Sequence, residues 1–234
     1  MEKFYERIRK ESKGIFCKDG GFEMKAFIFD LDGVIVFTDQ FHYQAWKKMA
    51  DSMGIYFDET INNRLRGVSR AESLEIILEK YEGTVSGEKK AELMEEKNNA
   101  YRELLKTMTP SDVTDAVRDT LKKLREAGYK LAIGSSSKNA KFILERVGLL
   151  DAFDAISDGT NITRSKPDPE VFVKAGEFLG IEAAECVVVE DAYAGIDAAK
   201  AAGMKAVGIG DASGYDKADI KIQSFEELLG IAGI

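Results

Sequence analysis

The chain has few of the residues on which several protein classes depend. Its 234 residues include two cysteines, three prolines, one histidine and one tryptophan. Cys17 and Cys186 lie far apart and match no metal-ligand spacing, so we expect reduced thiols, as in a cytoplasmic protein. No apolar run approaches the length of a membrane span, and the first residues carry no signal-peptide pattern. The sequence therefore predicts a cytoplasmic protein with no membrane partner.

Positive charge is also scarce, since 33 lysines and arginines face 41 acidic residues and give a formal net charge of −8. This balance argues against a nucleic-acid backbone or an anionic membrane as the main partner. It concerns the average surface, so it does not exclude a local positive pocket. The remaining composition, 44% apolar and 32% charged, is that of an ordinary globular protein. A chain of this length forms one large domain, or a domain with a sizeable insertion, and we expect a monomer.

The first 23 residues are polar, mixed in charge and end shortly after Asp-Gly-Gly. We treat residues 1–23 as an N-terminal extension that precedes the first strong strand at Met24. Two explanations stay open. Met24 is the natural start, or the segment is a short amphipathic helix that packs Phe4, Ile8 and Ile15 on the body of the protein.

Two patterns divide the rest of the chain. Between residues 37 and 107 the apolar residues follow helical spacing, Ser69 and Glu72 form a capping-box pair, and no strand is convincing. On either side, strands such as "YKLAIG" and "CVVVED" alternate with helices, which is typical of βαβ units. The sequence predicts an α/β fold: a Rossmann-like parallel sheet core with helices on both faces (24–36 and 108–234), plus an inserted all-helical cap domain (37–107).

Polar side chains follow the predicted strands at the point where each strand ends. The stretch "FIFDLDGVI" places Asp30 and Asp32 on either side of one residue. If both lie on one strand, their carboxylates point to the same side of it. A serine-rich loop, Ser135–Asn139, follows a second strand, Glu190 and Asp191 follow another, and Lys166 lies in the loop before a helix. Because the carboxyl ends of parallel strands form the ligand-binding edge, we expect these groups to converge.

The residue types at this edge suit a phosphoryl group and a divalent cation. Asp30, Asp32, Glu190 and Asp191 form an oxygen-rich anionic cluster, which suits Mg²⁺. A bound cation would offset the repulsion between these like charges. Lys166 adds positive charge, and Ser135 with the helix amides behind it binds phosphate oxygens. Each motif alone has a plainer explanation: a turn, a helix cap or a solvated loop lysine. Their joint position at strand ends favours a site.

In this order, "DLDG", Ser135, Lys166 and "ED" at 190–191 resemble the four signatures of the haloacid dehalogenase superfamily. The resemblance covers the chain from Met24 to its end. It implies that Asp30 is the nucleophile, which forms an aspartyl-phosphate, and that Asp32 is the general acid/base. It also implies that the carbonyl of Asp32 and the carboxylates of Asp30 and Asp191 hold Mg²⁺, with Glu190 as a ligand or a supporting residue. A carboxylate is a competent phosphoryl acceptor.

The insertion carries a narrower resemblance, to the β-phosphoglucomutase family, in "FHYQAW" (41–46), "RGVSRAESLEIIL" (66–78) and "SSSKN" (135–139). That family interconverts β-D-glucose 1-phosphate and D-glucose 6-phosphate through β-glucose 1,6-bisphosphate. The resemblance implies that Arg70 binds the phosphate that is not transferred, and that Ser137, Lys138 and Asn139 contact the same phosphate or the sugar. The implied substrate-binding residues are Asp32, Thr38, His42, Trp46, Gly67, Val68, Ser69, Arg70, Ser137, Lys138 and Asn139.

Alternatives remain for this set. Ser69 is explained equally well as a helix cap, and His42 as a packed, hydrogen-bonded residue of an apolar helix face. Phe37 precedes Thr38 where many relatives carry an acid. On the two resemblances together, the expected function is that of a Mg²⁺-dependent mutase acting on small hexose phosphates. The competitors are a sugar-phosphate phosphatase with the same residues and a non-catalytic phosphosugar-binding regulator.

Overall fold

The computed structural model describes residues 23–65 and 68–234. The two explanations for residues 1–23, together with Cys17 and Gly67, thus concern residues outside the described part, apart from Glu23. Six parallel strands form one sheet in the order β3-β2-β1-β4-β5-β6. The strands are β1 (Ala26–Phe29), β2 (Lys130–Gly134), β3 (Ala155–Ser157), β4 (Cys186–Glu190), β5 (Lys205–Gly208) and β6 (Ile220–Lys221). The predicted parallel sheet is confirmed.

Strand β1 lies in the middle of the sheet, between β2 and β4. Its side chains alternate between two apolar layers, with Phe27 and Phe29 in one and Ala26 and Ile28 in the other. All four are fully buried, as expected for a parallel strand covered on both faces. Because β1 is central, whatever follows it lies in the middle of the sheet's carboxyl edge.

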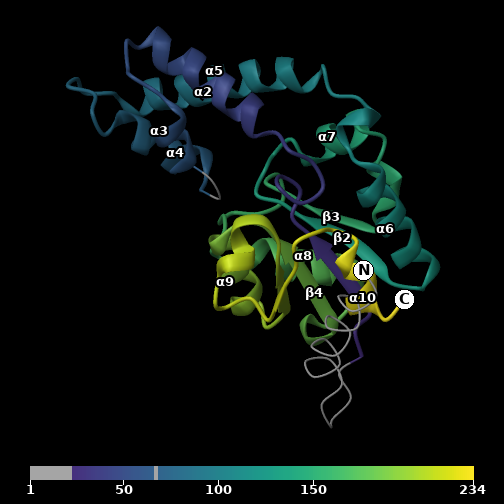
Figure 1. The fold of residues 1–234 in the computed structure, drawn as a ribbon. Coiled ribbons are helices and arrows are strands. Elements are labelled where there is room, and N and C mark those ends of the chain that lie inside the picture. Colours follow the sequence, from purple (N-terminus) through teal and green to yellow (C-terminus); the bar gives the residue numbers. More distant parts are fainter. Residues whose placement is uncertain (1–22, 66–67) are drawn as a thin grey trace.

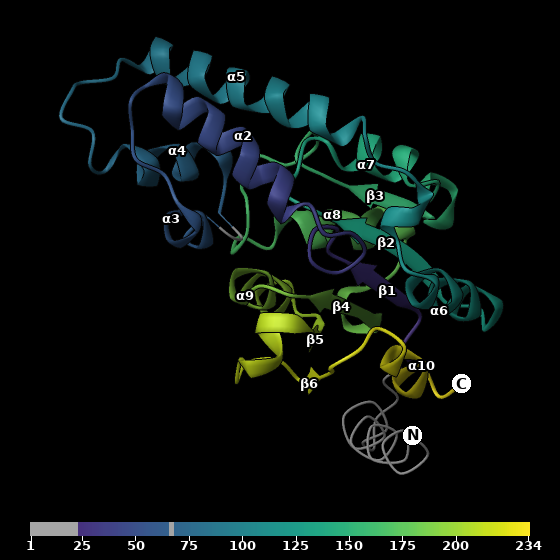
Figure 2. The same ribbon diagram turned by 45° about the horizontal axis from the view of Figure 1, so that its top comes forward.

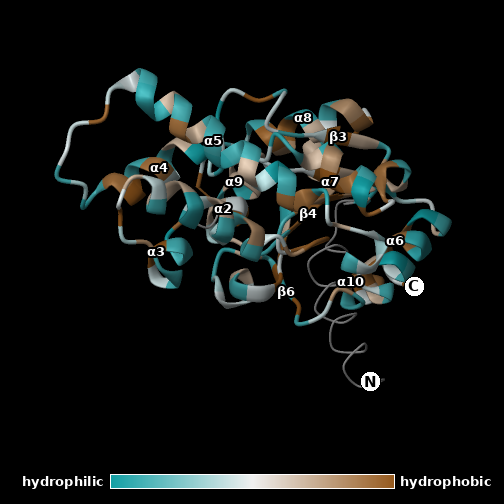
Figure 3. Cartoon of the chain, turned by 90° about the horizontal axis from the view of Figure 1, so that it is seen from above, coloured by the Kyte–Doolittle hydropathy of each residue, from teal (hydrophilic) through white to brown (hydrophobic). Residues whose placement is uncertain are grey.

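Helices cover both faces of the sheet (Figure 2). Helices α6 (Asp115–Glu126), α7 (Ala140–Arg146) and α10 (Glu227–Ala232) contribute apolar side chains to the layer of Phe27 and Phe29. Helices α8 (Glu170–Leu179) and α9 (Tyr193–Ala201) contribute apolar side chains to the layer of Ala26 and Ile28. Figure 3 shows the pattern behind this: β4 is brown, whereas α6 and α10 carry both teal and brown residues. Such helices bury one side only.

The insertion between β1 and β2 forms the cap, which extends away from the sheet in Figure 1. Its helices are α2 (Asp39–Ser52), α3 (Glu59–Asn63), α4 (Arg70–Leu78) and α5 (Gly87–Leu105), and its described part contains no strand. The cap has an apolar cluster of its own, which includes Trp46, Leu74 and Leu93. The predicted all-helical insertion is confirmed.

The cap is also fixed to the core. Ala45 of α2, and Tyr101 and Leu105 of α5, belong to the same buried cluster as Phe29. Arg146 of α7 donates hydrogen bonds to the carbonyls of Lys106 (2.7 Å) and Met108 (2.8 Å), in the segment that leads from α5 back to the core. In the described part of the chain, no helix is both long and apolar enough to cross a bilayer.

Phe29 tests the packing on which the sheet's central strand depends. Its ring contacts those of Phe153 (6.2 Å between centroids) and Phe225 (5.6 Å). Replacing it with alanine leaves a cavity, so we expect Phe29→Ala to lower the free energy of unfolding by about 3–5 kcal/mol in urea denaturation. Val173→Ala, at a partly exposed position of α8, is the control and should cost less than about 1 kcal/mol. Equal losses would contradict the assigned core.

Candidate active site

The two aspartates lie in a loop and not, as predicted, on one strand. Strand β1 ends at Phe29; the amide of Asp30 still donates to the carbonyl of Val189 (3.0 Å), and Asp32 forms only an isolated bridge with Val36. Gly33 turns the chain with a φ of +85°. A Cβ on Gly33 would lie 2.1 Å from Oδ2 of Asp191, so the absent side chain leaves room for that carboxylate.

Lys166 lies between two of the predicted acids. Its Nζ donates to Oδ1 of Asp30 (2.5 Å) and to Oε1 of Glu190 (2.6 Å). All three residues are buried, and the ammonium also lies 4.7 Å from the centroid of the Phe172 ring. Burial opposes the ammonium charge but the two carboxylates outweigh it, so the pKa of Lys166 is raised. Lys166 is a fixed cation at this position.

The acids around Lys166 exceed the charge that it can neutralise. Burial, with Glu190 nearby, raises the pKa of Asp30 to about 7 against the opposing effect of Lys166. Burial, with Glu190 and Asp30, raises the pKa of Asp191 to about 8. Both shifts mean that a second negative charge is costly here. A divalent cation would favour the ionised form of both carboxylates.

The donor set fits a hard cation with few protein ligands. Within the described residues, no three His, Cys, Asp or Glu side chains are grouped as a metal site. Glu190 uses both carboxylate oxygens, Oε1 for Lys166 and Oε2 for the amide of Ala192 (2.9 Å). Of the two roles predicted for Glu190, metal ligand or supporting residue, these hydrogen bonds favour the supporting role. Asp30, Asp191 and a backbone carbonyl suit Mg²⁺, which keeps several waters or phosphate oxygens.

Asp32 is tied to the cap. Its Oδ1 accepts a short hydrogen bond from the hydroxyl of Thr38, and that hydroxyl lies 2.9 Å from the hydroxyl of Tyr101 on α5. Burial raises the pKa of Asp32 to about 6, although Thr38 opposes the shift. A carboxyl with such a pKa exchanges protons close to neutral pH, as a general acid/base must. Thr38 was predicted from the sequence as a site residue, whereas Tyr101 was not.

Two predicted residues of α2, the half-buried His42 and the buried Trp46, lie beside a lysine that was not predicted from the sequence. Nζ of Lys97 lies 2.8 Å from Nδ1 of His42 and over the rings of Trp46 (4.9 Å) and Tyr101 (4.5 Å). Trp46 is buried. Burial first, then the Lys97 charge, lowers the pKa of His42, and burial with Arg70 lowers that of Lys97 to about 7. One signal was available: Lys97 interrupts the apolar stripe between Leu93 and Tyr101.

The serine-rich loop is ordered by its own side chains. Oγ of Ser135 accepts from the amide of Ser137 (3.1 Å), and Oγ of Ser137 accepts from the amide of Asn139 (3.2 Å). Ser135 and Asn139 are buried, whereas Lys138 is exposed. The loop leads directly into α7, so it presents its polar groups at that helix's beginning.

One oxygen brings the cap and the core together. Oδ1 of Asn98, on α5, accepts hydrogen bonds from Nη2 of Arg70 (2.8 Å) and from Nδ2 of Asn139 (3.1 Å). Arg70 begins α4 in the cap, whereas Asn139 precedes α7 in the core. The structure thus places two of the predicted substrate-binding side chains at one oxygen. Asn98 was missed, because it lies in the polar run "EEKNNA" without a motif.

The remaining predicted residues lie beside this contact. Val68 and Ser69 are half-buried just before α4. The capping box is confirmed, since Ser69 Oγ accepts from the amide of Glu72 (3.2 Å) and Glu72 Oε2 from the amide of Ser69 (3.0 Å). Ser69 therefore has a structural function, whatever it binds.

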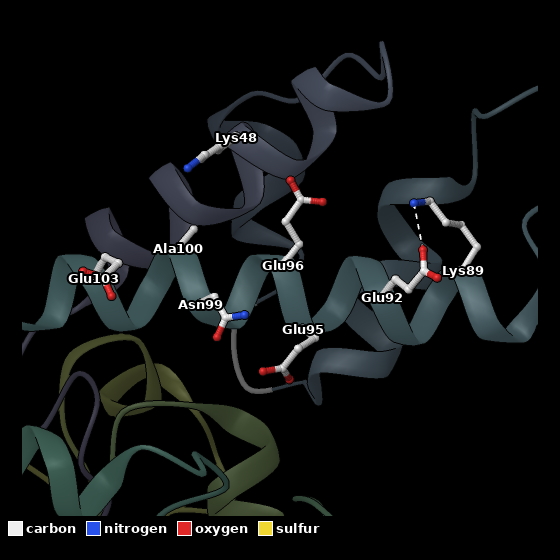
Figure 4. Close-up of a pocket in the computed structure, with 8 residues that line it drawn as sticks. All are labelled: Lys48, Lys89, Glu92, Glu95, Glu96, Asn99, Ala100 and Glu103. Carbon is white, nitrogen blue, oxygen red and sulfur yellow. Dashed lines mark hydrogen bonds and ion pairs between the residues drawn. The ribbon is translucent and has the colours of Figure 1, made fainter.

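A separate hollow of about 620 Å³ lies on the cap, lined by one residue of α2 and seven of α5 (Figure 4). Its lining residues are Lys48, Lys89, Glu92, Glu95, Glu96, Asn99, Ala100 and Glu103. None of them belongs to the predicted site. Most are charged, and like-charged carboxylates of this kind are typical of a solvated helix face.

Comparison with known proteins agrees with this geometry. Residues 24–203 match the model of the haloacid dehalogenase-like hydrolases. The chain belongs to this family. It is 42% identical over 207 residues to β-phosphoglucomutase of Bacillus subtilis, covering 88% of this chain and 92% of that one. The expected resemblance to both groups is confirmed, and the chain is an enzyme of the haloacid dehalogenase-like family.

A phosphatase and a solved mutase structure are also similar to this chain. The chain is 33% identical to a phosphorylated carbohydrates phosphatase of Thermotoga maritima, over 79% of this chain and 84% of that one. Among solved structures, a β-phosphoglucomutase of Clostridium difficile is 40% identical and superposes with a TM-score of 0.81, covering 88% of this chain and 93% of that one. The chain is thus similar in sequence to both a mutase and a phosphatase, and similar in structure to a mutase.

Gly33 tests the packing of the acidic cluster. We expect Gly33→Ala to reduce hydrolysis of a small aryl phosphate by about 100-fold or more, because the new Cβ displaces the Asp191 carboxylate. Gly128→Ala is the matched control: its φ of +93° is similarly strained, but nothing lies within 4 Å of the new Cβ. Steady-state rates of both folded variants give the comparison. An equal loss of activity in the two variants would contradict the predicted displacement of Asp191, because backbone strain alone would then account for it.

Proposed function

We propose that this enzyme is a β-phosphoglucomutase. It interconverts β-D-glucose 1-phosphate and D-glucose 6-phosphate through an aspartyl-phosphate at Asp30 and β-glucose 1,6-bisphosphate. The observation that carries the proposal is the meeting of Arg70 from the cap and Asn139 from the core at one point. A mutase must hold a second phosphate while it transfers the first. The similarity to β-phosphoglucomutases supports the same reading.

In this proposal, Asp30 attacks the phosphorus of the substrate and the sugar oxygen leaves. Lys166, 2.5 Å from the Asp30 carboxylate, keeps that carboxylate in place and adds positive charge where the phosphoryl oxygens gather. Glu190 fixes Lys166 in turn, at 2.6 Å. Ser135 and the loop amides behind it are the donors for those oxygens. Positioning and charge neutralisation supply most of the rate of phosphoryl transfer.

Asp32 handles the proton. It gives its proton to the leaving sugar oxygen and takes one from the hydroxyl that attacks the phosphoenzyme in the reverse direction. Thr38 fixes the orientation of the Asp32 carboxylate, and Tyr101 connects Thr38 to the cap. The orientation of the acid/base thus depends on the cap, which favours proton transfer when the cap covers the site.

The carboxylates of Asp30 and Asp191 and the carbonyl of Asp32 would hold Mg²⁺. When bound, Mg²⁺ would supply positive charge that offsets the negative charge of the phosphoryl group. The raised pKa values of the two carboxylates support this assignment, since burial and the neighbouring acids disfavour the ionised forms and a bound cation would favour them.

A second candidate is a sugar-phosphate phosphatase, which the similarity to a carbohydrate phosphatase favours. The two activities share every step up to the phosphoenzyme. They differ in the acceptor: a sugar hydroxyl for the mutase, water for the phosphatase. A closed cap that excludes water directs the phosphoryl group to the sugar.

The decisive experiment supplies β-glucose 1-phosphate, Mg²⁺ and a trace of the bisphosphate, and follows glucose 6-phosphate and inorganic phosphate together. We expect glucose 6-phosphate to form at least about tenfold faster than free phosphate, because the acceptor is the sugar. Asp30→Asn should remove both signals, which would exclude a non-catalytic regulator. Free phosphate released at the rate of conversion would favour the phosphatase and contradict the mutase.

Metal removal tests the acidic cluster. Chelation with EDTA should abolish turnover and Mg²⁺ should restore it, because the uncompensated carboxylates repel a phosphate dianion. Asp191→Asn should raise the Mg²⁺ concentration for half-maximal rate by about tenfold or more, with Asp211→Asn, an exposed acid of the 3-10 helix η4 (Gly210–Gly214) that follows β5, as control. Turnover that persists in EDTA, or equal Mg²⁺ dependence of both variants, would contradict the assigned ligands.

A further inference from the structure

Asn98 lies where three elements meet. Helix α5 carries Asn98, α4 begins with Arg70, and Asn139 immediately precedes α7. Asn98 Oδ1 accepts from both of the other side chains, at 2.8 Å and 3.1 Å. A single amide oxygen therefore joins a cap arginine to a core asparagine.

Both partners of Asn98 keep donors for a further ligand. A guanidinium carries about five N–H groups and an amide nitrogen two, so one bond to Asn98 leaves the others available. The asparagine is neutral, so it orders the arginine without cancelling its charge. An aspartate in its place would pair with the guanidinium and compete with a bound anion. The residue type thus suits a support for anion binding.

The position of Asn98 on α5 also connects the two ends of the site. Tyr101, which contacts the hydroxyl of Thr38 beside Asp32, follows Asn98 by three residues, about 4.5 Å along the helix axis. One rigid helix therefore sets the spacing between the acid/base aspartate and the Arg70–Asn139 pair. A substrate with a phosphate at each end needs such a fixed spacing.

We propose that Asn98 is a positioning residue of the distal-phosphate site: its side-chain oxygen holds Arg70 against Asn139 before the substrate binds. This inference rests on the proposed mutase function and adds a residue to it. The pre-arranged pair lowers the conformational cost of binding the phosphate that is not transferred. Asn98 touches neither reacting group, so its effect falls on substrate affinity and little on the chemical step.

The test compares Asn98→Ala and Asn98→Asp with Asn99→Ala. Asn99 is the next residue of the same helix, is exposed and lines the charged hollow of the cap, so it controls for helix stability. For conversion of β-glucose 1-phosphate we expect Asn98→Ala to raise KM about tenfold, as for loss of one hydrogen bond to a charged group. We expect Asn98→Asp to raise KM further, because a carboxylate repels the phosphate. Asn99→Ala should stay within about twofold of the wild type.

A second measurement separates positioning from a general structural effect. An aryl phosphate has no distal phosphate, so the loss of its kcat/KM in Asn98→Ala should be at least about fivefold smaller than the loss for the hexose phosphate. Equal losses for both substrates, or a KM within twofold of the wild type, would overturn the inference. Both outcomes leave the mutase function standing if the wild type still interconverts the two hexose phosphates.

A binding experiment keeps the inference testable without turnover. Calorimetric titration of glucose 1,6-bisphosphate into the Asp30→Asn enzyme measures affinity directly. Adding Asn98→Ala should weaken binding about tenfold, whereas adding Asn99→Ala should not. Equal affinities for the two double variants would overturn the inference, whatever the acceptor preference of the enzyme proves to be.

Discussion

The arrangement of the site depends on one buried interaction, the ammonium of Lys166 between the carboxylates of Asp30 and Glu190. A buried ion pair gains little net stability, but a carboxylate left without its partner is strongly destabilising. Two further acids, Asp32 and Asp191, add negative charge nearby, and burial raises the pKa of both. The cluster therefore holds more buried negative charge than Lys166 offsets, which lowers the stability of the fold. A bound cation would offset the remaining charge.

Helix α5 connects this cluster to the cap. Its Tyr101 and Leu105 lie in the apolar cluster of the core, and its Leu93 lies in that of the cap. Between them, Lys97 and Asn98 contact His42 and Arg70, while Tyr101 reaches Thr38 beside Asp32. A single continuous helix thus contacts both the apolar cluster of the cap and the residues beside Asp32.

The choice between mutase and phosphatase concerns the acceptor and leaves the phosphoenzyme chemistry unchanged. In the proposed mechanism, the residues that bind and attack the phosphoryl group belong to the core and would serve both activities. The residues proposed to distinguish the two activities, Arg70 and its neighbours, belong to the cap or contact it. On this proposal, family members with similar sequences can differ in reaction, because a few cap contacts would decide whether water or a sugar hydroxyl reaches Asp30.

The sequence by itself determined the parallel sheet, the helical insertion and the acids with Lys166, because strand alternation and strand ends are local patterns that fix where polar groups gather. It did not show that β1 ends at Phe29, which depends on how the loop around Gly33 packs on Asp191. Nor did it show Lys97, Asn98 and Tyr101 as parts of the site. Their partners lie 55, 28 or 41, and 63 residues away along the chain, so only tertiary structure brings them together.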